Sequence, residues 1–208
     1  GVANNWSIKK SVEFANVAAG VVVAKIGAQS ASLSEIEAYK NHISNSNKIK
    51  TQVDIELICN DIHTKNSQNT KDIDKKCKKI VFTNGCFDIL HSGHITYLQQ
   101  AKELGDILIV GLNDDLSVAR LKGDDRPINN EEDRALVLSA LECVDFVVIF
   151  KQDTPYELIT LVVPDILVKG GDYTFDSVVG NDIAKEVKIM NLVKEKSTTN
   201  IISKIQAR

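Results

Sequence analysis

The sequence predicts an α/β fold, a doubly wound parallel sheet, over residues 77–208. Two observations carry this prediction. Short apolar runs alternate with helix-length segments, which gives the βαβαβ order that right-handed crossovers wind into one sheet. The runs are hydrophobic throughout rather than alternating with polar residues, as is typical of parallel strands covered on both faces. In such a fold, ligands bind beyond the carboxyl ends of the strands.

The elements of this region follow from the apolar runs and from helix start signals. Strands are expected at residues 80–83, 107–112, 146–150, 166–168 and 187–190. Helices are expected at residues 94–104, 131–141, 155–163 and 199–206. Thr154, Pro155 and Glu157 predict the start of the third helix by a cap, a first-turn proline and a capping box. Asn130, followed by three acidic residues, predicts the start of the second helix.

Residues 1–40 form a separate, apolar zone. They contain an Ala/Val-rich helix over about residues 7–26, a turn at Gly27 and a short helical start at residues 32–35. The first helix is apolar around most of its circumference, so it is expected to belong inside a larger body. Left exposed, such a face would mark an interaction site, and we therefore expect the chain to self-associate as a homo-oligomer.

Residues 41–76 separate this zone from the sheet region. They are polar and rich in Asn, Lys, Ser and Thr. That composition predicts a linker, within which short helices are expected at residues 55–58 and 72–79. The division of the chain is thus predicted as a helical segment, a linker and one α/β domain.

Composition narrows the class of protein. The chain has 208 residues and a formal net charge of −3, so nothing electrostatic supports a nucleic-acid partner. The longest apolar run, residues 17–24, falls well short of the roughly 20 residues that span a bilayer, and it lacks the cleavage context of a signal peptide. The four cysteines include no C-x-x-C pair, which favours reduced thiols and gives no metal site. We expect a cytoplasmic protein without a membrane partner.

The stretch at residues 83–94, TNGCFDILHSGH, carries the chemistry. It follows an expected strand and leads into an expected helix, so His91 and His94 lie at a helix start. Backbone N–H groups there lack intrahelical partners and carry the positive end of the helix dipole, which suits a phosphate. Two imidazoles can donate to phosphoryl oxygens as charge builds up during transfer, while Gly85 and Gly93 let the backbone approach a ligand. The plainer interpretation is a strand–helix corner with incidental histidines.

Residues 78–208 resemble the H-x-G-H nucleotidyltransferase superfamily, which has a Rossmann-like fold. Within it they are most similar to the heptose-1-phosphate adenylyltransferase domain of a bifunctional bacterial heptose kinase/adenylyltransferase. Besides the motif, the stretches that match in family order are residues 117–123, 126–127, 132–134, 168–173 and 197–202. Residues 14–25 resemble the C-terminal end of the ribokinase-type kinase domain of the same enzymes. Residues 1–40 are therefore expected to be a remnant of that domain, without kinase activity because its Gly-Ala-Gly-Asp stretch is absent.

The resemblance implies transfer of AMP from ATP to D-glycero-β-D-manno-heptose 1-phosphate, giving ADP-heptose and pyrophosphate for lipopolysaccharide core biosynthesis. Mg²⁺ is expected to accompany ATP and to be held mainly by phosphate oxygens. His91, His94 and Lys122 are the implied catalytic residues. Arg126 and Arg134 are the implied ligands of the substrate phosphate. The implied nucleotide-binding residues are Thr83, Asn84, Gly85, Cys86, Phe87, Asp88, Gly171, Asp172, Ser197, Thr198 and Thr199.

Several of these residues have plainer interpretations. Lys122, expected on a mobile loop, could be a solvated surface lysine, and Arg134 could form a helix-surface ion pair with Glu131. Asp88 could orient a backbone group or His91, or cap the turn. Cys86 is interpreted as a packing residue because no base accompanies it.

The C-terminal phosphate site and the choice of substrate stay open. Residues 197–199 could form a helix cap alone, and residues 194–196, Lys-Glu-Lys, depart from the family, which usually has a glycine two positions before Ser-Thr-Thr. The runner-up function is a cytidylyltransferase for a small phosphorylated alcohol such as glycerol-3-phosphate. A non-catalytic nucleotide-binding module is the third interpretation.

Overall fold

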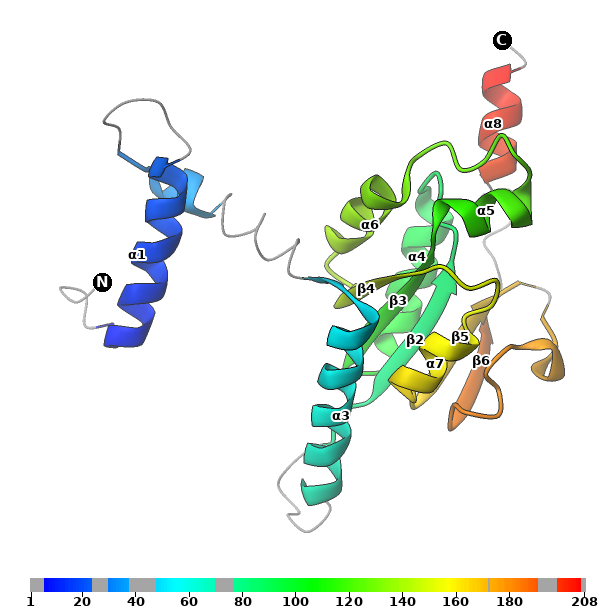
Figure 1. Ribbon diagram of the computed structural model, residues 1–208, viewed down its shortest axis with the longest axis horizontal. Coiled ribbons are helices and arrows are strands. Elements are labelled where there is room, and N and C mark those ends of the chain that lie inside the picture. The colour runs from blue at the N-terminus through cyan, green and yellow to red at the C-terminus, as the bar shows by residue number, and fades with distance from the viewer. Residues whose placement is uncertain are drawn as a thin grey trace. The chain divides into compact units, whose positions relative to one another are not determined.

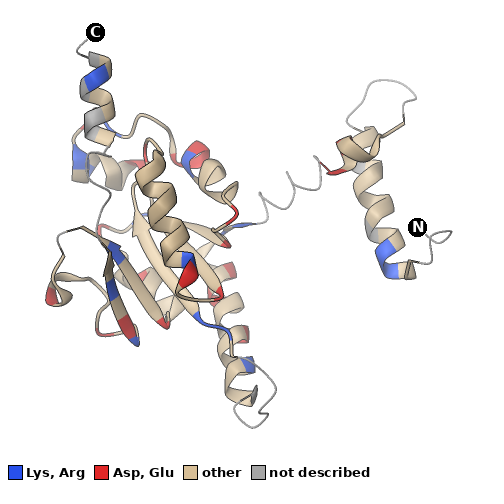
Figure 2. Cartoon of the chain, turned by 180° about the vertical axis from the view of Figure 1, so that it is seen from behind, with Lys and Arg blue, Asp and Glu red and all other residues tan. Residues whose placement is uncertain are grey.

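The computed structural model describes residues 6–23, 30–37, 48–69, 77–171, 173–190 and 198–206. The chain divides into two compact units, residues 1–47 and residues 48–208 (Figure 1). Among the described residues, no helix combines the length and the apolar character that crossing a membrane requires. Figure 2 shows that acidic and basic residues are interspersed along the elements of the second unit.

The first unit contains α1 (Ile8–Val23) and a helical turn at residues 33–37. The Trp6 ring packs edge-on against Phe14, with ring centroids 5.5 Å apart. Val21 and Ile36 are buried, whereas Ile8 and other apolar residues of α1 are exposed. The described part of α1 lies within the helix predicted at residues 7–26, and the last three residues of that prediction lie outside the described residues.

The second unit is built on one sheet of six parallel strands in the order β1-β4-β3-β2-β5-β6. The strands are β1 (Ile49–Lys50), β2 (Ile80–Gly85), β3 (Ile107–Asn113), β4 (Phe146–Phe150), β5 (Ile166–Gly170) and β6 (Glu186–Met190). The chain runs from β2 outward to β4, then returns across the sheet to β5. That reversal confirms the predicted doubly wound fold and places its switch point between β2 and β5.

Helices cover both faces of the sheet (Figure 1). The helices of this unit are α3 (Gln52–Asn69), α4 (Ser92–Glu103), α5 (Asp115–Lys122), α6 (Glu131–Ser139), α7 (Tyr156–Val162) and α8 (Thr198–Gln206), with a short 3₁₀ turn at Phe175–Ser177. Alternate residues of β2 enter different cores: Phe82 packs with residues of α3 and α7, and Val81 packs with residues of α4 and α6. All seven residues of β3 are buried, which explains its unbroken apolar run.

Residues 48–69 differ from the linker predicted for residues 41–76. Within them, β1 pairs in parallel with β4 at the edge of the sheet, and α3 packs Ile55 and Cys59, both fully buried, into the core. Thr51 caps α3 reciprocally with Asp54, because each accepts a hydrogen bond from the backbone N–H of the other. The expected short helix at residues 55–58 is therefore the middle of a longer one. Of the other expected helix, residues 77–79 are not helical and residues 72–76 lie outside the described residues.

The helix starts agree with the predictions only in part. The start of α6 is confirmed, since the Asn130 side chain accepts from the Asp133 N–H at 2.9 Å. At α7, Pro155 is the cap residue and makes no side-chain cap, while the Glu157 carboxylate accepts from Gln152 instead of closing a capping box. The helix α5 was not predicted; it begins at Asp114, whose carboxylate accepts from the Ser117 N–H at 2.7 Å.

Candidate active site

A pocket of about 510 Å³ opens at the carboxyl ends of the central strands, beside the first turn of α4. Its walls come from the loop after β2, the end of β5, the end of α5 and the loop that follows α5. The lining residues are Asn84, Gly85, Cys86, Phe87, Asp88, His91, Gly93, His94, Tyr97, Asn113, Leu121, Lys122, Arg126, Lys169, Gly170, Tyr173 and Thr198. Most of the residues expected to bind substrate are therefore brought together at the switch point.

His91 and His94 form a stacked pair at the start of α4. His91 is the cap residue of the helix, and its backbone carbonyl accepts from the His94 N–H at 2.9 Å. The two rings stack with centroids 3.9 Å apart, and the Phe87 ring meets His94 edge-on at 5.4 Å. Phe87 adopts a left-handed backbone conformation with φ of 44°, which a bulky residue rarely takes. Both histidines line the pocket.

The pocket holds His94 in its neutral form. Burial, together with the charge of His91, lowers the pKa of His94 to about 4. The Nδ1 atom of His94 is buried and has no hydrogen-bond partner among the described residues. An anion in the pocket would offer a hydrogen-bond partner and raise the pKa of His94, because a nearby negative charge favours imidazolium.

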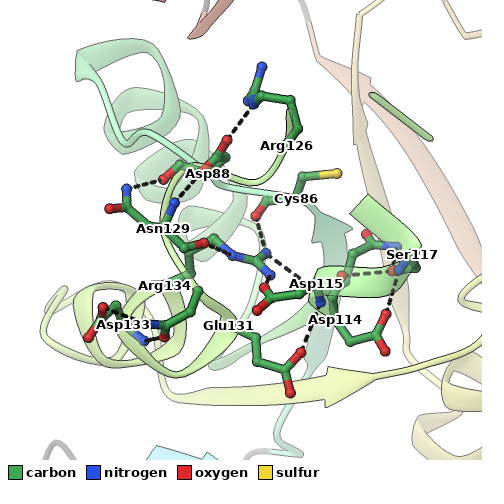
Figure 3. Close-up of polar contacts among 12 residues, drawn as sticks. Cys86, Asp88, Asp114, Asp115, Ser117, Arg126, Asn129, Glu131, Asp133 and Arg134 are labelled. Atoms are coloured by element: carbon green, nitrogen blue, oxygen red, sulfur yellow. Dashed lines mark hydrogen bonds and ion pairs between the residues drawn. The ribbon is translucent and has the colours of Figure 1, made fainter. Parts of the chain in front are cut away.

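Asp88 fastens the loop after α5 to the loop after β2 (Figure 3). Its buried carboxylate accepts from the backbone N–H groups of Ile128 and Asn129 at 2.8 and 3.0 Å, and from Arg126 Nε at 2.5 Å. The Asn129 side-chain amide donates in return to the Asp88 carbonyl. Burial opposes ionisation of Asp88, but the hydrogen bonds outweigh it and lower its pKa. Of the roles open to Asp88, the structure gives it the orientation of a backbone segment, residues 128–129.

Arg126 lies in the pocket wall as expected for a substrate-phosphate ligand. Its ion pair with Asp88 uses Nε, and no described residue bonds the two terminal nitrogens of the guanidinium. Lys122 is the last residue of α5 and is exposed, so it ends a helix rather than lying on a loop. Both cations belong to the segment that follows β3, and both line the pocket.

Arg134, predicted as a ligand of the substrate phosphate, does not line the pocket. The side chain is 2% exposed, and each donor nitrogen is taken (Figure 3). Nε donates to the Asn129 carbonyl, one terminal nitrogen donates to the carbonyls of Cys86 and Asn113, and the other pairs with Asp115 at 2.6 Å. The alternative pair with Glu131 is absent too, since that carboxylate accepts from the Asp115 N–H. Arg134 supports the pocket loops from behind.

Three residues that were predicted to bind the nucleotide, Thr83, Gly171 and Cys86, make contacts within the protein. The hydroxyl of Thr83 is buried and bonds the Tyr97 hydroxyl at 2.7 Å. The N–H of Gly171 donates to the Met190 carbonyl of the neighbouring strand. Cys86 lines the pocket, but burial raises the pKa of its thiol, which agrees with a packing role. Neither Thr83 nor Gly171 lines the pocket.

The C-terminal site is only partly described. Thr198 lines the pocket, and its hydroxyl donates to the Ile89 carbonyl at 3.3 Å. Asp172, Ser197 and the side chain of Thr199 lie outside the described residues, as do residues 194–196. The role of Thr198 as a nucleotide ligand therefore stays a prediction.

Lys169, at the end of β5, is a pocket residue that the sequence predictions missed. It is 8% exposed, and its ammonium donates to the Asn84 side-chain oxygen. The Tyr173 ring centroid lies 5.7 Å from Nζ. Burial lowers the pKa of Lys169 to about 8. The sequence feature that could have indicated this residue is a lysine within the apolar run at residues 166–170.

Most of the ionisable side chains that line the pocket carry or can carry a positive charge. Five of its side chains can be cationic, and its one carboxylate, that of Asp88, is already bonded by N–H groups and Arg126. Among the described residues, no group of three acidic, His or Cys side chains could hold a metal ion. The arrangement suits ligands that bring several negative charges, such as phosphates.

The chain is similar in sequence to known proteins. Residues 82–206 match the cytidylyltransferase-like family. The chain is 56% identical to the Bifunctional protein HldE of a Nitratiruptor species, with 99% of this chain and 43% of that protein covered. It is 53% identical to the Bifunctional protein HldE of Aliarcobacter butzleri, with 99% and 41% covered. The chain thus spans about two fifths of these curated relatives.

A solved structure is also similar to this chain. It is the lipopolysaccharide core biosynthesis protein from Thermoplasma volcanium, at 36% identity. The match covers 57% of this chain and 99% of that one, with a TM-score of 0.48.

Proposed function

Because this chain belongs to the cytidylyltransferase-like family, we propose that it transfers AMP from ATP to a heptose 1-phosphate, releasing pyrophosphate. The observation that carries the proposal is the stacked pair of His91 and His94 inside a pocket that is also lined by Lys122, Arg126 and Lys169, and whose one carboxylate, Asp88, is already paired with Arg126. Both substrates and both products are polyanions, so such a pocket favours all of them. The heptose acceptor is proposed because relatives more than half identical are bifunctional HldE proteins and because of the motifs at residues 117–134.

The reaction is a displacement at the α-phosphorus of ATP. An oxygen of the sugar phosphate forms a bond to that phosphorus, and the bond from the α-phosphorus to the oxygen bridging to the β-phosphate breaks. The electron pair leaves with pyrophosphate, and no proton needs to move. Catalysis then consists of positioning and of stabilising charge on the α-phosphoryl and leaving-group oxygens.

His91 and His94 would donate to those oxygens. A neutral His94 offers one N–H, and the incoming phosphates would raise its pKa and make a second donor available. Lys122 and Arg126 would neutralise phosphate charge from the side of the pocket next to β3, where the Asp88 contact holds Arg126 in place. Arg126 keeps its terminal guanidinium nitrogens for an oxygen of the substrate.

Mg²⁺ would enter as the counter-ion of ATP. The pocket lining includes one carboxylate, Asp88, and its oxygens already accept from two backbone N–H groups and from Arg126. A metal would therefore be held by phosphate oxygens and water rather than by a set of protein carboxylates.

The experiment is a pyrophosphate-release assay that crosses ATP and CTP with heptose-1-phosphate and glycerol-3-phosphate. The proposal expects release with ATP and heptose-1-phosphate that depends on Mg²⁺, and little release with CTP. Equal or better turnover of CTP with glycerol-3-phosphate would support the cytidylyltransferase alternative. Nucleotide binding without release from any pair would support a non-catalytic module.

A further inference from the structure

Lys169 is a buried cation for which the described part of the chain provides no anion. Its side chain is 8% exposed, and its hydrogen-bond partner is the neutral side-chain oxygen of Asn84. No carboxylate among the described residues forms an ion pair with it. An ammonium has three donors and a full charge, and burying it without an anionic partner costs free energy. A fold keeps such a group at a pocket wall when a ligand supplies the missing charge.

Lys169 lies on the opposite side of β2 from Lys122 and Arg126. Lys122 and Arg126 belong to the segment that follows β3, on one side of β2, whereas Lys169 ends β5 on the other side. His91 and His94 begin the helix that follows β2 itself, between the two. The pocket therefore presents cations on both sides of the histidine pair, which suits a reaction that joins two phosphate-bearing substrates.

We propose that Lys169 is a substrate-binding residue that exchanges its contact with Asn84 for a phosphoryl oxygen of a substrate on the β5 side of the pocket. The inference rests on the proposed transfer between two phosphorylated substrates. The phosphoryl group belongs either to ATP or to the sugar phosphate, and binding measurements with each substrate alone distinguish the two.

The test substitutes Lys169→Met, which keeps the length of the side chain and removes its charge, and Lys169→Arg, which keeps the charge. The control is Lys188→Met on β6, because Lys188 pairs with Glu186 and does not line the pocket. Dissociation constants are measured by calorimetry for MgATP without acceptor and for heptose-1-phosphate without nucleotide. The melting temperature of each ligand-free variant is measured in parallel.

We expect Lys169→Met to weaken one of the two substrates about 10- to 100-fold, as loss of a charged hydrogen bond does. Lys169→Arg should recover part of that loss, and Lys188→Met should bind like the wild type. The ligand-free melting temperature of Lys169→Met should be unchanged or higher, because an uncompensated buried charge has been removed. Weakening of MgATP assigns the contact to the nucleotide, and weakening of heptose-1-phosphate assigns it to the acceptor.

Two results would overturn the inference. One is wild-type affinity of Lys169→Met for both substrates. The other is a lower ligand-free melting temperature with both affinities reduced together, which would make Lys169 a structural partner of Asn84. Neither result affects the proposed function, because that is judged by pyrophosphate release from the wild-type chain.

Discussion

The Asp88 carboxylate and the Arg126 guanidinium meet at 2.5 Å, although they are 38 residues apart in the chain. Asp88 also accepts from the backbone N–H groups of Ile128 and Asn129. One buried carboxylate therefore holds the loop that carries Arg126 against the loop that carries the histidines. The ion pair fixes the distance between two parts of the pocket that the sequence separates.

Replacing Asp88 with alanine should destabilise the protein and impair the pocket. Two backbone N–H groups and a guanidinium would lose their acceptor, and breaking a buried pair costs about 3–5 kcal/mol. Denaturant unfolding should show that loss, and Asp88→Asn should show a smaller one. The control is Asp153→Asn, which removes a pair with Arg120 whose side chains are 49% and 77% exposed and should change stability by under about 1 kcal/mol. Equal effects of Asp88→Ala and Asp153→Asn would refute the loop-fastening role.

His94→Ala should lower kcat by about two to three orders of magnitude, as loss of one transition-state donor does, with a smaller change in ATP affinity. His91→Ala should behave similarly. His63→Ala is the matched control, because His63 lies on α3 and contacts the Val162 carbonyl at 3.1 Å, away from the pocket. Steady-state pyrophosphate release measures all three variants. Near-full turnover by both pocket variants would show that the proposed site is wrong.

Binding of MgATP should take up protons, provided that Lys169 contacts the nucleotide. The pKa of Lys169 is about 8 in the free pocket, below the ordinary value of about 10.5, and an anion should raise it again. Near pH 9 the free lysine is mostly neutral and the bound one charged, so affinity should fall as pH rises from about 8 to 10. Calorimetry in two buffers of different ionisation enthalpy counts the protons. Lys169→Met should abolish the uptake; unchanged uptake would assign it to another group.

Arg134 tests the distinction between supporting a pocket and binding its ligand. Arg134→Met would leave the Asp115 carboxylate and three backbone carbonyls without their donor, so we expect a loss of several kcal/mol in the free energy of unfolding. The less disruptive Arg134→Lys should retain the affinity for MgATP in whatever fraction remains folded. A folded Arg134→Lys protein with strongly reduced phosphate affinity would restore the predicted phosphate-clamp role.

These residues also show what the sequence could and could not predict. The strands β2 to β5 were predictable because buried parallel strands appear in a sequence as apolar runs. The contacts of Arg134 reach Cys86, 48 residues away, and the burial of Lys169 depends on neighbouring strands. Neither the contacts of Arg134 nor the burial of Lys169 can be recognised from the residues next to it in the sequence. The helix α3 was missed because it buries one narrow face, including Ile55 and Cys59, while its many polar residues dominate the composition.

Two truncations test where the catalytic unit of the chain begins. Removing residues 1–40 should leave pyrophosphate release intact, since every residue that lines the pocket lies after position 80. It should also shift the protein toward monomer, because the exposed apolar residues of α1, such as Ile8 and Val12, are then gone. Light scattering and the activity assay on the same samples measure the two effects. Loss of activity would mean that residues 1–40 contribute to the active fold.

Removing residues 1–76 should have the opposite effect on activity. This truncation also deletes β1 and α3, and with them the side chains that pack on Leu158, Ile159 and Val162 of α7. Exposing that apolar surface should destabilise the domain by several kcal/mol, at about 25 cal/mol for each Å² exposed. We therefore expect poor folding and little transferase activity, read by circular dichroism and pyrophosphate release. A folded, active protein would instead support the division predicted from composition, in which residues 41–76 are a linker. The pair of truncations thus places the start of the catalytic unit between residues 41 and 76 or after them.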